Sequence, residues 1–189
     1  MVKNMNHQFY HTFSSPFDTF TIVWKTIKSK LQLQRIFLSD PKLGSENKAL
    51  ESIEHIKLGS SSSIAVLGDK IQHFLSGEDV EFDLALVDFT LCTKTQIKVL
   101  QAEFRIPRGC ISTYKRIANH ISITNGARVV GNSLARNPFP IIIPCHRVIK
   151  SNGEIGGYQG GIEMKLKLLE MEGIEFSSKG KLITDRLYY

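Results

Sequence analysis

Three prolines within seven residues restrict the backbone of one segment more than any other feature of this sequence. Pro138, Pro140 and Pro144 lie in the stretch 137–148, which ends Cys-His-Arg-Val. Proline lacks a backbone N–H and fixes φ, and it biases the preceding residue toward extended conformations. We therefore predict an extended, stiff backbone in this segment, with Cys145 held at its end.

The pair Cys145-His146 is a candidate for nucleophilic chemistry. The thiolate is the nucleophilic form of cysteine, and a neighbouring cation such as Arg147 favours it. The imidazole that follows directly in the chain is a candidate base. Most buried cysteines are nevertheless inert apolar residues, and side chains that are adjacent in sequence need not touch. The dipeptide alone therefore does not establish a reaction.

The remaining cysteines do not indicate a metal site or a disulfide framework. Cys92, Cys110 and Cys145 are widely spaced, and no second Cys/His pair stands at zinc-like spacing. No uninterrupted apolar run exceeds four residues, whereas a membrane helix needs roughly 18. We expect no metal, no cofactor and no membrane association. The odd cysteine count favours a reducing compartment, the cytoplasm or, in a eukaryote, the nucleus.

Positive charge is concentrated in one block of the chain. Residues 1–92 carry 9 Lys or Arg against 11 Asp or Glu, residues 93–167 carry 12 against 3, and residues 168–189 carry 3 against 4. The middle block has a net charge of +9 in a chain whose total is +6. This excess of Lys and Arg over Asp and Glu favours binding of a polyanionic partner, with nucleic acid the leading candidate. A solvated basic face is the alternative.

Residues 1–90 have the pattern of a small domain of strands and helices. Segments rich in aromatic and β-branched residues predict three strands, 9–13, 19–24 and 31–38. Apolar residues at helical spacing predict two helices, 46–56 and 65–75. An acidic connector then leads to a domain boundary near residue 90.

Residues 91–175 have the pattern of a helical domain, followed by a tail over 176–189. Thr93 and Gln96 form the capping-box pattern Thr-x-x-Gln, and Ser112 is expected to cap a second helix. The predicted helices are 93–104, 112–121 and 127–135. The last two are joined by a tight turn, as in a helix-turn-helix. Packed helical hairpins that bind no DNA show the same spacing.

Several blocks in this domain resemble the O6-alkylguanine-DNA alkyltransferase family. In chain order they are Gly126-Ala127-Arg128-Val129-Val130-Gly131, Asn137-Pro138-x-Pro140, Pro144-Cys145-His146-Arg147-Val148 and Gly156-x-Tyr158-x-Gly160-Gly161. The resemblance covers residues 106–173 and is thin across the first domain. It implies an α+β chain with a ribonuclease-H-like N-terminal domain, a small antiparallel sheet with helices. A helical, winged helix-turn-helix domain would follow, with residues 153–158 as the wing.

The resemblance implies a methylated-DNA–protein-cysteine methyltransferase activity that each molecule performs once. Cys145 would irreversibly accept the alkyl group of O6-alkylguanine in duplex DNA. His146 would act as its base through a bridging water, and Glu172 would orient the imidazole. Tyr114 would donate a proton to the leaving guanine, and Asn137 would tie the helix-turn-helix to the active-site segment. A carboxylate is unfavourable at a helix C-terminus, which supports a buried role for Glu172.

The same resemblance implies double-stranded DNA carrying O6-alkylguanine as partner of a monomeric protein. The reactive oxygen is inaccessible in the stack, so the nucleotide must be flipped out. Arg128 would fill the vacated space from a helix in the minor groove, where Ala127 and Gly131 permit close approach. Two basic residues would contact phosphates, Lys115 and Arg136. Three residues would form the guanine pocket, Val148, Tyr158 and Gln159, of which Gln159 departs from the serine usual in the family.

Three other functions fit parts of the sequence. A non-catalytic lesion recogniser would share the DNA-binding features, but relatives of that kind lack the cysteine. A thiol-dependent hydrolase would use Cys145 and His146 and leave the basic block unexplained. A transcription factor would need more Arg, Asn and Gln side chains on the third predicted helix for base readout.

Overall fold

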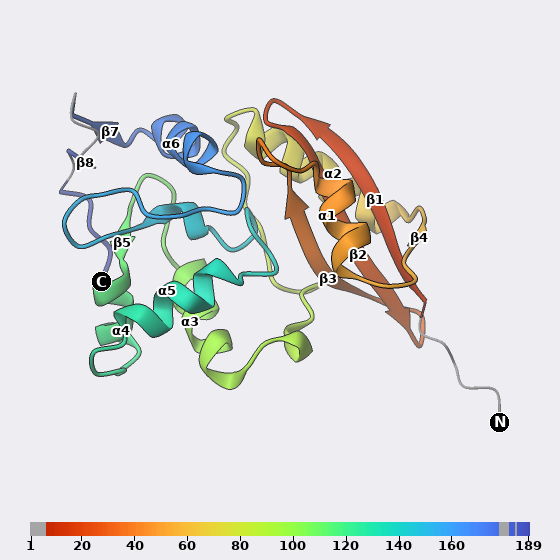
Figure 1. Ribbon diagram of the computed structural model, residues 1–189, viewed down its shortest axis with the longest axis horizontal. Helices are drawn as coiled ribbons and strands as arrows, with labels where there is room; N and C mark the ends of the chain where they lie inside the picture. The colour runs from red at the N-terminus through yellow and green to blue at the C-terminus, as the bar shows by residue number, and fades with distance from the viewer. Residues whose placement is uncertain (1–6, 178–181, 184) are drawn as a thin grey trace. The chain divides into compact units, whose positions relative to one another are not determined.

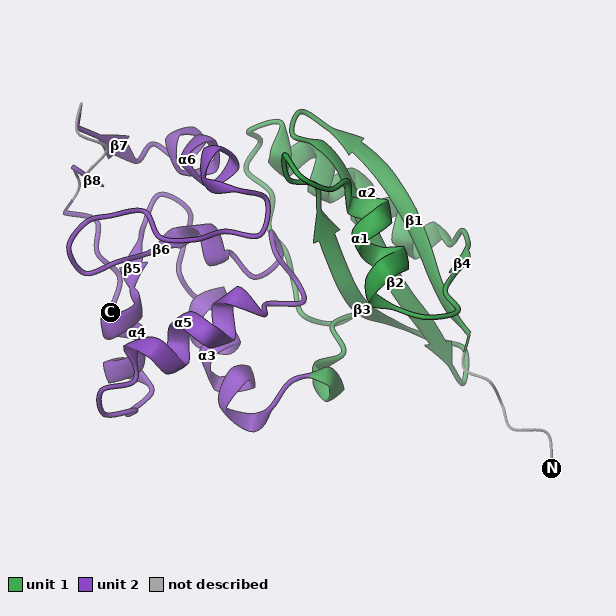
Figure 2. Cartoon of the chain, in the orientation of Figure 1, with its two compact units in different colours: residues 1–91 green, residues 92–189 purple. Residues whose placement is uncertain are grey.

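The computed structural model describes residues 7–177, 182–183 and 185–189 (Figure 1). The chain is α+β, as expected, and divides into two compact units, Met1–Leu91 and Cys92–Tyr189 (Figure 2). The prediction of a separate tail over 176–189 is wrong for the end of the chain. Ile111 forms a parallel bridge with Leu187, and the Tyr189 hydroxyl donates to the Ala102 carbonyl at 2.7 Å, so these residues pack on the second unit.

Three strands of the first unit form an antiparallel meander: β1 (Gln8–Ser15), β2 (Asp18–Ile27) and β3 (Lys30–Leu38). The first turn consists only of Pro16 and Phe17, so β1 and β2 are longer than predicted. Lys28 and Ser29 both have positive φ, as a two-residue type I′ turn requires. A short β4 (Lys57–Leu58) pairs parallel to β1. The sheet order is β3-β2-β1-β4. The expectation of an antiparallel sheet is therefore wrong for the β1–β4 pair, which is parallel.

Helices pack on both faces of this sheet: α1 (Ser45–Ser52) and α2 (Ser62–Leu75). Ala49 of α1 clusters with Val23 of β2. Phe20 lies three residues before Val23, so its side chain points to the opposite face, where it stacks on Phe13. Gly68 of α2 lies against Phe13, and a Cβ there would come within 2.2 Å of the ring. Only glycine allows α2 this close to β1.

The described part of the second unit is built mainly on α3 (Lys94–Phe104), α4 (Tyr114–His120), α5 (Ala127–Ala135) and α6 (Ile162–Met171). The Thr93 hydroxyl accepts from the Gln96 N–H at 3.2 Å, as the capping-box pattern predicted. The Gln96 side chain instead donates to the Ser133 and Arg136 carbonyls and so ties α3 to α5. Thr113, rather than Ser112, caps α4.

The second unit also contains short elements: β5 (Ser112–Thr113), β6 (Val148–Ile149), β7 (Glu175–Phe176), β8 (Leu182–Ile183) and the 3-10 turn η2 (Cys145–Arg147). Another 3-10 turn, η1 (Phe89–Leu91), ends the first unit. β5 pairs parallel to β6. This pairing brings the start of α4 beside the residues that directly follow η2. Residues 153–158, the expected wing, form a loop without strand pairing. Within the described ranges no helix has the length and apolarity needed to cross a membrane.

Candidate active site around Cys145

The proline-rich segment forms a tight turn in its middle, so the prediction that it is extended throughout is wrong. The Ile143 N–H donates to the Phe139 carbonyl at 2.9 Å, and Ile141 has a φ of 74°, which is rare for a β-branched residue. Asn137 holds this turn from within. Its amide nitrogen donates to the Ile143 carbonyl at 3.1 Å, and its oxygen accepts from the Phe139 N–H at 2.9 Å.

Cys145 begins η2 directly after this turn and is only 8% exposed. Burial raises the pKa of its thiol to about 12, and the nearby Glu103 carboxyl adds to the effect. A hydrogen bond with Asn137 and the positive charge of Lys165 act in the opposite direction. The Arg147 guanidinium, which was expected to favour a thiolate, binds the carboxylate of Glu172. The thiol is therefore protonated in the isolated protein, and its reaction requires a base.

His146 and Glu172 form a buried pair beside the cysteine. His146 Nε2 lies 2.9 Å from Glu172 Oε1, and both side chains are buried. Arg147 completes the cluster by donating from Nε and Nη2 to the same carboxylate at 2.8 and 2.7 Å, and from Nη1 to the Ile106 carbonyl at 2.7 Å. The sequence did not predict Arg147 as a partner of Glu172. This fork-like contact offsets the cost of placing a carboxylate at the C-terminus of α6.

The charges in this cluster favour a neutral imidazole and an ionised carboxylate. Burial lowers the pKa of His146, and its hydrogen bond with Glu172 only partly restores it. Burial alone would raise the pKa of Glu172, but hydrogen bonds from His146 and Arg147 outweigh it and hold that pKa at about 2. A neutral His146 is the form that accepts a proton.

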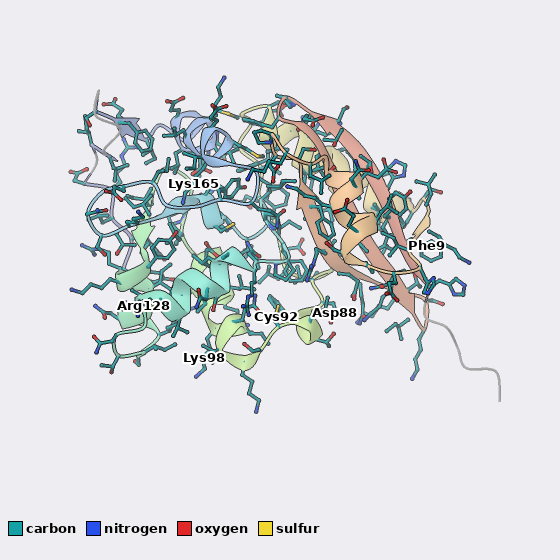
Figure 3. The ribbon with its side chains drawn as sticks, in the orientation of Figure 1. Phe9, Asp88, Cys92, Lys98, Arg128 and Lys165 are labelled. Carbon is teal, nitrogen blue, oxygen red and sulfur yellow. The ribbon has the colours of Figure 1, made fainter. Side chains whose placement is uncertain are left out.

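Sequence reasoning also missed two ionisable side chains in this site, Lys165 and Glu103. Lys165 of α6, labelled in Figure 3, is fully buried and donates to the Val148 carbonyl at 2.6 Å and to the Gly157 carbonyl at 3.3 Å. Burial lowers its pKa to about 8. A signal was available, because Lys165 falls on the apolar face that α6 forms with Leu168 and Leu169.

Two tyrosines lie in the same neighbourhood. Tyr114 begins α4. Burial raises the pKa of its hydroxyl, and the negative charge of an ionised Cys145 would raise it further. A Cβ on Gly156 would lie 2.7 Å from the Tyr114 hydroxyl, so the expected wing approaches this side chain closely. The Tyr158 ring meets the His146 ring edge-on, with centroids 6.2 Å apart. Val148 is buried in β6, and Gln159 is half-buried after Tyr158.

The predicted DNA-contacting residues lie on α4, on α5 and, for Arg136, directly after α5. Lys115, Arg128 and Arg136 are exposed, and Figure 3 shows Arg128 on α5. Ala127 and Gly131 of α5 are half-buried. A Cβ on Gly131 would lie 3.9 Å from the Tyr114 ring, which places this turn of α5 next to the site. The exposed cations and the buried nucleophile therefore belong to one structural unit.

This chain is similar to known proteins of one family. A family model described as 6-O-methylguanine DNA methyltransferase, DNA binding domain, matches residues 94–174. The methylated-DNA–protein-cysteine methyltransferase of Methanothermobacter thermautotrophicus is 44% identical over 132 residues, which are 69% of this chain and 74% of that protein. The corresponding protein of Mycobacterium leprae is 39% identical over 116 residues, which are 61% and 68% of the two chains.

A solved structure covers both units. The crystal structure of Mycobacterium tuberculosis OGT in complex with DNA superposes with a TM-score of 0.69 at 32% identity, covering 87% of this chain and 92% of that one. With its buried cysteine, the adjoining histidine and the carboxylate that binds it, this chain belongs to the methylated-DNA–protein-cysteine methyltransferase family.

Proposed function

We propose that this protein repairs DNA by transferring the alkyl group of O6-alkylguanine to Cys145, once per molecule. The observation that carries the proposal is the buried thiol followed directly by His146, whose ring is bound to Glu172 at 2.9 Å. A protonated, water-shielded thiol beside a neutral imidazole suits a nucleophile that is activated only when the substrate is in place. No cofactor takes part in the proposed reaction.

In the proposed reaction, the thiol proton passes to His146 through a bridging water. The sulfur forms a bond to the alkyl carbon while the bond from that carbon to the guanine oxygen breaks, and the electron pair stays on the guanine. Tyr114 donates a proton to the departing base, and Glu172 stabilises the imidazolium. The product is a thioether, whose carbon–sulfur bond water does not cleave, so each molecule would repair one lesion.

Burial of the nucleophile is the argument for base flipping. With 8% of Cys145 exposed, its sulfur cannot reach an oxygen inside a base stack. The damaged nucleotide must rotate into the site, where main-chain groups of Cys145 and Val148, with Tyr158 and Gln159, form the guanine pocket. Arg128 would fill the gap left in the duplex. Lys115 and Arg136 would bind phosphates, and the small residues Ala127 and Gly131 would let α5 approach the minor groove.

The finer description of the fold belongs to this proposal. We assign α4 and α5 to a helix-turn-helix, with the loop 153–158 as its wing. The order β3-β2-β1-β4, with its parallel β1–β4 pair, supports a ribonuclease-H-like first unit. The protein would act as a monomer on double-stranded DNA, and therefore in the cytoplasm or, in a eukaryote, the nucleus.

The experiment compares the wild type with Cys145→Ser on a duplex containing one O6-methylguanine. The serine variant should bind the duplex nearly as well and transfer no methyl group, because a hydroxyl is a far weaker nucleophile. Transfer by the serine variant would refute the assignment of the nucleophile.

A second candidate is a lesion recogniser without chemistry. The raised pKa of Cys145 favours it, since a thiol that never ionises never reacts. The same experiment separates the two candidates, because a recogniser would bind the damaged duplex and leave the wild-type protein unmodified.

A further inference from the structure

Glu103 is a buried carboxyl group that the proposed reaction does not use. It lies near the end of α3, on the buried face that also carries Val99, Leu100 and Ala102. Its exposed fraction is 0%, and neither of its oxygens has a hydrogen-bond partner among the described residues. An ionised carboxylate in such surroundings is strongly disfavoured. Burial accordingly raises the pKa of Glu103 well above its ordinary value, and the charges of Lys165 and Arg147 only partly oppose this.

The ionisable groups that interact electrostatically with Glu103 come from α4, α6, η2 and the loop that contains Tyr158. They are the cations Lys165 of α6 and Arg147 of η2, and the neutral acids Cys145 of η2, Tyr114 of α4 and Tyr158 of the following loop. Arg147 is already paired with Glu172. Among the described residues, the hydrogen bonds of the Lys165 ammonium go to two carbonyl oxygens, those of Val148 and Gly157. When Glu103 is neutral, no carboxylate charge offsets the positive charge of the Lys165 ammonium, and this charge acts on Cys145.

We propose that Glu103 is a positioning residue that controls how much positive charge acts on the sulfur of Cys145. While Glu103 is neutral, the ammonium of Lys165 stabilises the developing thiolate. When Glu103 ionises, its charge opposes that of Lys165, and the thiolate becomes harder to form. Reactivity of the nucleophile thus depends on the protonation of a side chain that contacts neither base nor DNA. The inference rests on Cys145 being the nucleophile of the proposed function.

The test measures alkylation of Cys145 by iodoacetamide, which needs no DNA. The full-length wild type and Glu103→Gln are compared from mildly acidic to alkaline pH, and the adduct at Cys145 is quantified by peptide mapping. Both proteins should react at equal rates at the acid end. The variant should gain on the wild type as Glu103 ionises, reaching on the order of tenfold. Lys165 titrates in both proteins, so the ratio of the two rates is the quantity to follow.

A purely structural role for Glu103 would give a rate ratio that is the same at every pH, and that result would overturn the proposal. Glu163→Gln, the same change at an exposed position of α6, is the matched control and should leave the ratio at one throughout. Infrared spectroscopy supplies a second measurement that needs no variant. The wild type should keep the carbonyl band of a protonated carboxylic acid at pH values where ordinary carboxyl groups are ionised, and its absence there would contradict the proposal.

Transfer from a duplex containing O6-methylguanine is measured on the same samples. If transfer fails in the wild type while the iodoacetamide ratio changes with pH as described, the proposed function is wrong and the role of Glu103 stands. If transfer succeeds and the ratio is constant, only the role of Glu103 is wrong.

Discussion

His146 Nε2 and Glu172 Oε1 lie 2.9 Å apart, although the two residues are 26 positions apart in the chain. Arg147, the next residue after His146, donates to both oxygens of the same carboxylate, from Nη2 to Oε1 and from Nε to Oε2. One buried acid thus fixes the orientation of the imidazole and neutralises the adjacent guanidinium. If the proposed function holds, Glu172 contributes both to the stability of the unit and to the reactivity of Cys145.

Glu172→Gln should weaken both properties. The amide still accepts a hydrogen bond but carries no charge, which leaves Arg147 unpaired and destabilises the fold by about 3 kcal/mol. Transfer should slow on the order of a hundredfold, since the imidazolium loses its counter-ion. Urea unfolding and single-turnover rates check the two effects. Glu170→Gln, at an exposed position of the same helix, should change neither, and equal losses in both variants would refute a specific role for Glu172.

Stability should fall in acid in two steps. The pKa of His146 is lowered in the folded protein, so stability is lost as pH drops below about 6.5, where the unfolded chain gains the proton. The pKa of Glu172 is lowered to about 2, so its contribution is complete above about 4.5 and is lost as pH falls toward 2. The second step amounts to about 3 kcal/mol. Asp40 and Asp88 also have lowered pKa values and lose their contributions in the same acid range. Unfolding free energies measured against pH should therefore fall by about 3 kcal/mol less in Glu172→Gln than in the wild type over this range, and equal losses in the two proteins would contradict the assignment.

Asn137→Ala should open the turn before the cysteine. The change removes the hydrogen bond that Asn137 makes to each end of that turn, at a cost of about 1–3 kcal/mol, while the Ile143 carbonyl keeps the bond that it accepts from the Cys145 N–H at 2.8 Å. Because Asn137 also lowers the pKa of Cys145, iodoacetamide should react more slowly with the variant at a given pH. Asn132→Ala, on the exposed side of α5, is the control. Unchanged stability and thiol reactivity would show that the turn does not depend on Asn137.

Arg128→Ala should distinguish base flipping from the chemical step. Repair of O6-methylguanine in a duplex should fall substantially, while reaction with a free O6-alkylguanine base should be nearly unchanged, because the base needs no extrusion. Arg136→Ala should instead weaken DNA binding and reduce its salt dependence, as expected of a phosphate contact. Equal losses of Arg128→Ala on duplex and free base would refute the flipping role.

Local patterns predicted most of the secondary structure, because they depend on neighbouring residues. The strands of β1 to β3, the hydroxyl of Thr93 at the start of α3 and the range of α5 all follow from short spacings. The turn at Ile141 was missed because proline bias argues for extension, whereas the Asn137 side chain stabilises a tighter path.

The inner electrostatics of the site could not be predicted from local patterns. Arg147 and Lys165 contributed to the basic block that suggested nucleic acid, yet the structure uses both inside the protein, on Glu172 and on backbone carbonyls. The charges of Glu103 and Lys165 act on each other although the two residues are some 60 positions apart in the chain. Contacts of this kind depend on tertiary structure, and no spacing along the chain encodes them.

The central claim is that Cys145 itself becomes alkylated, once. The most direct measurement is the intact mass of the protein before and after incubation with excess duplex containing one O6-methylguanine, followed by peptide mapping. The account predicts one added methyl group per molecule, located on Cys145, with no turnover beyond it. A protein that binds the damaged duplex tightly and keeps its original mass would contradict the account and identify a recogniser of the lesion.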